Sequence, residues 1–242
     1  MSHITVITPA YNCANEIRQT IISVAAQSYG DWDMVIVDDV STDGTGDVCQ
    51  RLAAQLGLSE KIAIVRRNEK FGETRNTYDI CQQIGDDVIV LRLDGGDWLT
   101  DTDCFHIIDQ AYEATSAELV WTAQRWAFTS HNISGPLDAS ISPYLQPWKS
   151  SHLKTFRRRA MNDINIKNYL DDSGDWIMIA CDQAVFLPML EKAWREKKPL
   201  VFLNMCMYHY NIDLEDSTLF QKPRSKRQKM SAEWIRARGY IE

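Results

Sequence analysis

The sequence has no hydrophobic run that could cross a membrane, because no apolar segment approaches the roughly 20 residues that a bilayer-spanning helix needs. It also lacks the charged n-region and apolar h-region of a secretory leader. A strand-like segment, ITVIT at residues 4–8, stands in their place. We therefore expect a cytoplasmic protein without a transmembrane segment.

Paired cysteines and a positive net charge are absent as well. None of the six cysteines belongs to a Cys-x-x-Cys pair, so the sequence indicates neither a zinc knuckle nor a disulfide framework. The 33 acidic and 26 basic residues give a formal net charge of -7. This balance argues against a surface that binds nucleic acid on all sides, although it allows a local basic patch. No internal repeat or low-complexity run occurs.

The sequence does contain an alternation of strand-like and helix-like segments over residues 1–127. This alternation predicts a mostly parallel, Rossmann-like α/β sheet flanked by helices. We expect Pro9 to end the first strand and Asn15 to cap the first helix. The predicted strands are 4–8, 32–37, 62–66, 88–93 and 119–127, and the predicted helices are 16–27, 46–56, 73–84 and 102–115.

The remaining residues have a different composition. Residues 128–147 are rich in Ser, Asn, Gly and Pro, which is typical of irregular loops. We expect a helix at 182–192 that Pro188 interrupts, and a strand at 200–210. We divide the chain into an α/β region (1–127), a second region of the same domain (128–220) and a basic tail (221–242).

The stretch DDVIVLRLDGGDWL at residues 86–99 organises the rest of the chain. Its apolar run predicts a central strand, and Asp94 and Asp97 follow where that strand ends. Asp38 and Asp39 follow the second predicted strand in the same way. Because parallel strands end at the same edge of a sheet, these acids are expected to meet one ligand. A nucleotide sugar suits this edge, since carboxylates accept hydrogen bonds from a base or a ribose, and a divalent ion neutralises a diphosphate.

Four motifs carry a resemblance to a known family. TPAYN at residues 8–12, the segment 21–45, Arg75-Asn76 and LDGGDW at residues 93–98 resemble family 2 glycosyltransferases, which have the GT-A fold. The resemblance covers about the first hundred residues well. It implies a nucleotide-sugar donor, with a UDP-sugar as the first expectation, and transfer to an acceptor hydroxyl with inversion. It also implies that Pro9, Tyr11 and Asp39 frame the base, that Arg75 lies beside the diphosphate and that Asp94 lies near the ribose or a metal.

One position departs from the pattern of that family. Gly96 stands where the family usually has a metal-binding acid in an Asp-x-Asp-Asp motif. We therefore expect weakened use of Mg²⁺ or Mn²⁺ through Asp94, with Asp97 and His209 as further ligands. Two alternatives are catalysis by Arg75 and other cations without a metal, and an inactive nucleotide-sugar-binding protein disabled at Gly96.

The second region is expected to supply the catalytic base and the acceptor site. Asp182 matches the position of the family's catalytic Asp, although Cys181 replaces the Glu that usually precedes it. A base must lie on the acceptor side of the anomeric carbon. The alternative is that Asp182 only caps a helix. His152, Lys154 and Arg157 resemble a stretch that some members carry between donor and acceptor, where cations could hold a phosphate or an anionic acceptor; the alternative is a solvated basic loop.

The expected acceptor is a glycan or a lipid-linked glycan. The basic tail at 222–238 raises two further expectations, peripheral contact with anionic lipid and, as an alternative acceptor, the hydroxylated bases of phage-type DNA. A solvated helix is the third reading of this tail. A nucleotidyltransferase is disfavoured, because no Gly-rich basic loop follows the first strand.

Overall fold

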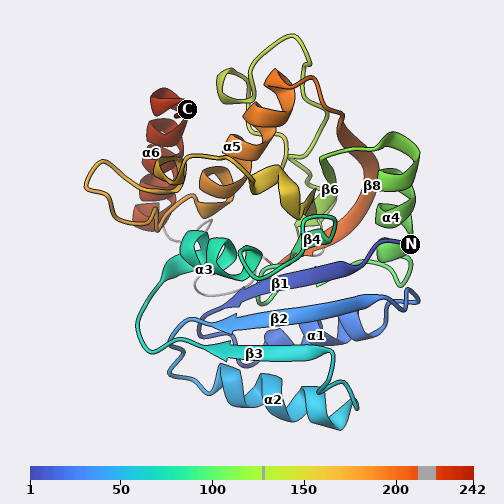
Figure 1. The fold of residues 1–242 in the computed structure, drawn as a ribbon. Coiled ribbons are helices and arrows are strands. Elements are labelled where there is room, and N and C mark those ends of the chain that lie inside the picture. The colour runs from blue at the N-terminus through green and yellow to red at the C-terminus, as the bar shows by residue number, and fades with distance from the viewer. Residues whose placement is uncertain (127–128, 212–221) are drawn as a thin grey trace.

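Four parallel strands form one half of an eight-stranded sheet, whose order is β3-β2-β1-β4-β7-β6-β8-β5 (Figure 1). The computed structural model describes residues 1–126, 129–211 and 222–242. The parallel half places β1 between β2 and β4, which is the arrangement of a doubly wound α/β protein. Its strands are β1 (Ile4–Ala10), β2 (Trp32–Asp38), β3 (Ile62–Arg66) and β4 (Ile89–Arg92).

The other half of the sheet is mixed. β7 pairs antiparallel with both β4 and β6, and β8 runs parallel to β6. Residues 154–157, for which the sequence also allowed a solvated basic loop, therefore form a strand inside the sheet. The strands of this half are β5 (Trp98–Leu99), β6 (Leu119–Trp126), β7 (Lys154–Arg157) and β8 (Leu200–Tyr210).

Helices cover both faces of the sheet, and alternation along the strands assigns each face to one core cluster. Ile89 and Leu91 of β4 pack with the first cluster, whereas Val90 packs with the second. The first cluster contains residues of α1 (Ile17–Ala25), α2 (Thr45–Gln55) and α4 (Cys104–Thr115). The second contains residues of α3 (Gly72–Cys81) and α5 (Cys181–Arg195). Figure 1 shows α1 and α2 on one side of β1–β3 and α3 on the other.

The basic tail forms α6 (Lys222–Arg238), which packs against α5. Ile235 is buried in a third cluster with Ile177 and Leu187. Arg238 is directed inward and donates to the backbone carbonyls of Asn168 and Leu170. Part of the positive charge of the tail is therefore used in packing. Among the described residues, no helix combines the length and the apolar character that a bilayer span requires.

The structure corrects three local predictions. Pro9 lies inside β1 and does not end it. The edge of β1 that carries the Pro9 nitrogen and carbonyl faces Gly95, beyond the end of β4, so the missing N–H of Pro9 removes no hydrogen bond from the sheet. Glu16, not Asn15, precedes α1, and no side chain caps that helix. Pro188 does not interrupt α5, which runs continuously over Cys181–Arg195 and is buried on both sides of the proline.

Candidate active site

The ends of β1, β2 and β4 border a cavity of about 250 Å³, which we call the Tyr11 cavity. Tyr11 is 48% exposed there, and the Lys70 ammonium lies 3.0 Å from the centre of its ring. Asp39 and Asp94 line the same cavity, as the shared edge of parallel strands predicts. Its walls also include Pro9, Gly72, Asn76 and Gly95.

Asp39 is held in place by backbone N–H groups at the start of α3. Its two carboxylate oxygens accept hydrogen bonds from the N–H groups of Phe71 (2.9 Å) and Gly72 (3.0 Å), and Lys70 Nζ lies 3.4 Å away. Burial works to raise the pKa of Asp39, but these hydrogen bonds outweigh it and the pKa is lowered. Asp39 is therefore ionised at neutral pH and fixes the shape of this wall.

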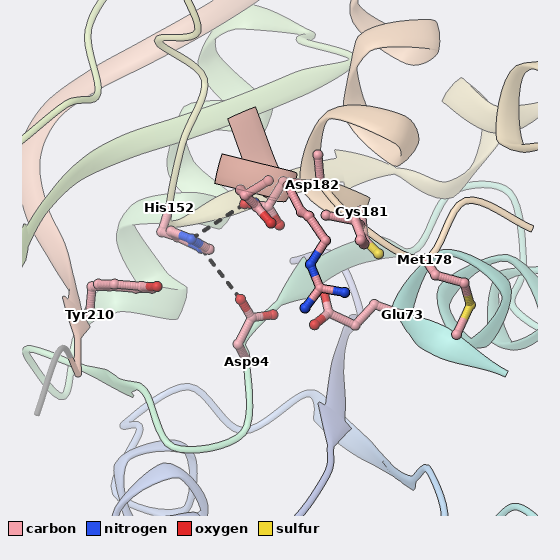
Figure 2. Close-up of a pocket in the computed structure, with 11 residues that line it drawn as sticks. Glu73, Asp94, His152, Met178, Cys181, Asp182 and Tyr210 are labelled. Carbon is pink, nitrogen blue, oxygen red and sulfur yellow. Dashed lines mark ion pairs between the residues drawn. The ribbon is translucent and has the colours of Figure 1, made fainter. Parts of the chain in front are cut away.

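A second cavity of about 330 Å³, the central cavity, adjoins the first and shares Glu73, Asp94 and Met178 with it. His152 and Asp182 form its far wall, and Figure 2 shows the imidazole between the two carboxylates. His152 Nδ1 lies 3.9 Å from Asp94 Oδ2, and His152 Nε2 lies 3.6 Å from Asp182 Oδ2. The three residues predicted separately from three parts of the sequence therefore meet at one place.

His152 is uncharged at neutral pH. Burial, reinforced by the nearby Lys154 ammonium, lowers the pKa of His152 to about 4. Its ring stacks on Tyr208, with the ring centres 4.5 Å apart. A neutral imidazole is the form that ligates a metal.

Asp94, His152 and Asp182 together offer a donor set for a divalent ion. Each contributes one ligand atom, and these atoms lie within 4.8 Å of one another. Two carboxylate oxygens and one imidazole nitrogen fit Mn²⁺. The two carboxylate oxygens also suit Mg²⁺, which prefers oxygen ligands to nitrogen ligands. The residues present therefore fit the expected metal, although not through the Gly96 position.

Two buried cations neutralise the carboxylates of this site. Lys154 Nζ lies 2.9 Å from Asp182 Oδ1, and Arg92 Nη2 lies 3.0 Å from Asp94 Oδ1. The antiparallel register of β4 and β7 pairs Arg92 directly with Lys154, which explains why both reach the same place. Lys154 was predicted here. Arg92 was missed, although an arginine inside the apolar run VIVLRL was a signal for it.

The Lys154 ammonium also sets the protonation of Asp182. Burial works to raise the pKa of Asp182, but the attraction of Lys154 is stronger and holds the pKa well below its usual value. Glu73, in the first turn of α3, was also missed by sequence reasoning. Desolvation and the nearby Asp94 carboxylate raise the pKa of Glu73, and solvent moderates the shift because 47% of its side chain is exposed.

The structure does not bring Arg157 or His209 to these cavities. Arg157 lies three residues beyond Lys154 on β7, so it points to the opposite face, where it donates to the Asp87 carbonyl. His209 alternates with Tyr208 and Tyr210, which both stack on His152. Its own ring stacks on Trp98 instead, with the ring centres 5.0 Å apart.

Arg75 and Asp97 also lie elsewhere. The Arg75 guanidinium lies 3.6 Å from the centre of the Phe71 ring and 3.8 Å from Asp79. Asp97 is buried, and it accepts hydrogen bonds from the Tyr208 hydroxyl (2.5 Å) and the Asn211 N–H (2.8 Å). Burial raises the pKa of Asp97 well above its usual value. The positions of Asp97 and His209 therefore give no support to their expected role as metal ligands.

The fold is of the GT-A class, which comprises nucleotide-sugar-dependent transferases. It combines a parallel half-sheet that has acids at its strand ends with the antiparallel strand β7, which carries the opposite wall of the site. The chain belongs to glycosyl transferase family 2, whose model matches residues 5–172. TuaG of Bacillus subtilis, whose name assigns it to teichuronic acid biosynthesis, is 44% identical over 69 residues, which are 28% of this chain and 26% of TuaG. WfaP of Escherichia coli, named a UDP-Glc:alpha-D-GlcNAc-diphosphoundecaprenol beta-1,3-glucosyltransferase, is 36% identical over 52 residues, which are 22% of this chain and 21% of WfaP. The matched segments thus span about a quarter of these relatives or less.

Solved structures share the fold at low sequence identity. S. aureus TarS 1-349 in complex with UDP-GlcNAc has a TM-score of 0.66 at 16% identity, with 90% of this chain and 61% of that chain covered. Glucosyl-3-phosphoglycerate synthase from Mycobacterium tuberculosis, in complex with Mn²⁺, UDP and glucosyl-3-phosphoglycerate, has a TM-score of 0.61 at 17% identity, with 100% and 82% covered. These likenesses confirm the predicted fold class.

Proposed function

We propose that this protein transfers a sugar from a nucleotide diphosphate donor to a hydroxyl group of a glycan or lipid-linked glycan, with inversion at the anomeric carbon. One observation carries the proposal. The Tyr11 cavity and the central cavity share Glu73, Asp94 and Met178, so they lie side by side, and we call the two together the trough. Asp39 lies towards one end of that trough and Asp182 towards the other.

The Tyr11 cavity suits the nucleotide. The exposed Tyr11 ring offers a stacking surface for a base, and Lys70 supplies a positive charge beside it. We assign Pro9 and Asp39, which line the same cavity, to the frame around the base. A uracil base is our first choice, because the TarS complex holds UDP-GlcNAc and WfaP is named for UDP-Glc.

Asp182 is the proposed base. The acceptor oxygen attacks the anomeric carbon, the bond from that carbon to the β-phosphate oxygen breaks, and the hydroxyl proton passes to a carboxylate oxygen of Asp182. Lys154 keeps Asp182 ionised before the reaction. The nucleoside diphosphate leaves with the electron pair of the broken bond.

Asp94 and His152 would hold a divalent ion, with Asp182 as a third ligand when it does not act as base. When bound, such an ion would neutralise charge on the departing diphosphate. Arg92 orients the Asp94 carboxylate. Lys154 Nζ lies 3.2 Å from His152 Nδ1 and adds a second positive charge next to the imidazole. The cations Arg92, Lys154 and Arg227 also favour an anionic leaving group in this cavity without a metal.

An Asp182→Asn variant tests the assignment of the base. We expect it to bind UDP in metal-free buffer as the wild type does and to lose at least about 100-fold in kcat, because general base catalysis contributes about 10²–10⁴-fold. UDP binding is measured by thermal shift, and kcat by the release of UDP from a UDP-sugar in the presence of an acceptor. Asp101→Asn, at an exposed aspartate outside the cavities, is the matched control.

If the Asp182→Asn variant keeps the kcat of the wild type, Asp182 is excluded as the base. A wild-type protein that binds UDP-sugars without any turnover would favour the alternative of a non-catalytic nucleotide-sugar-binding protein.

A further inference from the structure

A third cavity of about 190 Å³ lies on the side of Asp182 away from the Tyr11 cavity, and we call it the Trp126 cavity. It shares His152, Ala180, Asp182, Tyr210 and Gln228 with the central cavity, so it opens onto the proposed base. We propose that the Trp126 cavity binds an uncharged pyranose ring of the acceptor, so that the sugar that receives the transfer is neutral rather than phosphorylated or acidic. This inference rests on the proposed function and names its acceptor class.

Aromatic rings form part of the cavity lining. Trp126, Trp148 and Tyr210 all line it, and the ring centres of Trp126 and Tyr210 lie 6.5 Å apart. The face of an aromatic ring carries partial negative charge, so it attracts the C–H groups on one face of a pyranose. The volume is below the roughly 300 Å³ at which pockets for drug-sized ligands begin, which suits one sugar ring.

Neutral hydrogen-bonding groups supply the polar part of the lining. Gln124, Gln183 and Gln228 contribute amides, and Ser151 and Ser225 contribute hydroxyls. The carbonyl oxygen of Gln124 accepts from Ser151 Oγ and from His152 N, both at 3.2 Å, which orients the amide and directs its NH₂ group away from these partners. Groups that both donate and accept match sugar hydroxyls, which do the same.

The Trp126 cavity differs from the Tyr11 and central cavities in the charged residues that line it. Among the described residues that line the Trp126 cavity, Asp182 is the only Asp, Glu, Lys or Arg. Lys70 and Arg227 line the Tyr11 and central cavities instead. Lys154 lies behind this lining, where its charge is paired with Asp182 at 2.9 Å, and Arg236 Nη1 lies 3.5 Å from Gln183 Oε1. A phosphate or carboxylate in the Trp126 cavity would face the Asp182 carboxylate without a cation among the described lining residues.

An acceptor panel tests this inference with the complete chain. UDP release from UDP-glucose and UDP-GlcNAc is measured with the methyl glycosides of glucose, galactose and N-acetylglucosamine, and with two anionic partners, methyl glucuronide and glucose 6-phosphate. We expect neutral glycosides to give at least about 10-fold higher kcat/KM than the anionic partners, which corresponds to about 1.4 kcal/mol.

A variant links this preference to the cavity. Trp126→Ala should raise the KM for the best neutral acceptor by about 10-fold or more while kcat changes less, and Trp126→Phe should restore most of the affinity. Trp194→Ala, at a tryptophan that lines a different cavity, is the matched control and should leave both constants unchanged. Thermal melting of each variant shows whether it is folded.

The outcomes separate this inference from the proposed function. Faster transfer to the anionic acceptors, or a KM that Trp126→Ala leaves unchanged, would overturn the neutral acceptor site while the transferase activity stands. Absence of UDP release with every acceptor and with water would overturn both proposals.

Discussion

Lys154 controls the electrostatics of the site at the scale of single residues. It is fully buried, and its ammonium contacts the Asp182 carboxylate and the His152 ring at the same time. This positive charge keeps Asp182 ionised, and burial together with the same charge keeps His152 neutral. These are the states that a base and a metal ligand require.

Lys154→Met should shift the pH dependence of transfer. The pKa of Asp182 is lowered in the folded protein, so wild-type activity that needs the ionised carboxylate persists as the pH falls to well below the usual aspartate range. Without the ammonium, burial is no longer opposed and the pKa rises, so we expect an acid limb of kcat/KM that the wild type does not show above pH 4. The measurement is a pH profile of UDP release between pH 4 and 8. The same profile in both proteins would contradict the role of Lys154.

Asp94 and Asp97 should differ in their effects on metal-dependent binding. Asp94→Asn removes a carboxylate from the donor set, so the increase that Mn²⁺ adds to the UDP-induced thermal shift should be lost. Asp97→Asn should keep that increase, because its amide can still accept from the Asn211 N–H and donate to the Tyr208 hydroxyl. Loss of the Mn²⁺ effect in Asp97→Asn but not in Asp94→Asn would reverse the assignment.

At the scale of secondary-structure elements, the turn after β4 determines how closely the ends of β4 and β1 approach each other. A Cβ added at Gly95 would lie 2.9 Å from the Pro9 carbonyl oxygen, so only glycine fits against β1 there. Gly96 has a φ of 108°, its N–H donates to Thr20 Oγ1, and its carbonyl accepts from Asn211 Nδ2. The glycine at the expected metal position is therefore part of the turn geometry as well as a missing acid.

Gly96→Asp should lower stability rather than restore a metal site. A non-glycine residue at this φ is strained, and we expect a loss of about 1–3 kcal/mol in the free energy of unfolding, measured by urea denaturation. Gly174→Asp carries a comparable backbone strain at a φ of 85° with nothing within 4 Å of its Cβ position, so it serves as the control. A Gly96→Asp variant as stable as the wild type and with a larger Mn²⁺ effect on UDP binding would favour the disabled-site alternative.

The order of strands and helices was predictable at the scale of the whole molecule, and the neighbours within the sheet were predictable only in part. Apolar periodicity located β1 to β4 and the helices between them, and the parallel-edge rule placed Asp39 and Asp94 on one trough. The insertion of β7 between β4 and β6 was not predicted, because a strand pattern does not identify the partner strand.

The errors in the site have the same physical origin. Alternation along a strand separates Arg157 from Lys154 and His209 from Tyr208, but the sequence does not show which face of β7 or β8 borders the cavities. Arg92 was overlooked because its strand is otherwise apolar. The Trp126 cavity combines residues of β6, α5, α6 and the segment before β7, and only the tertiary structure brings these together.

A crystal structure of the protein soaked with UDP and Mn²⁺ would show whether the nucleotide lies in the trough between Asp39 and Asp182. We expect the uracil against Tyr11 and Asp39, with the diphosphate reaching Asp94 and His152 and with Asp182 open beyond it. UDP bound elsewhere, for example in the 390 Å³ cavity lined by Trp121 and Trp194, with the trough empty, would contradict this expectation.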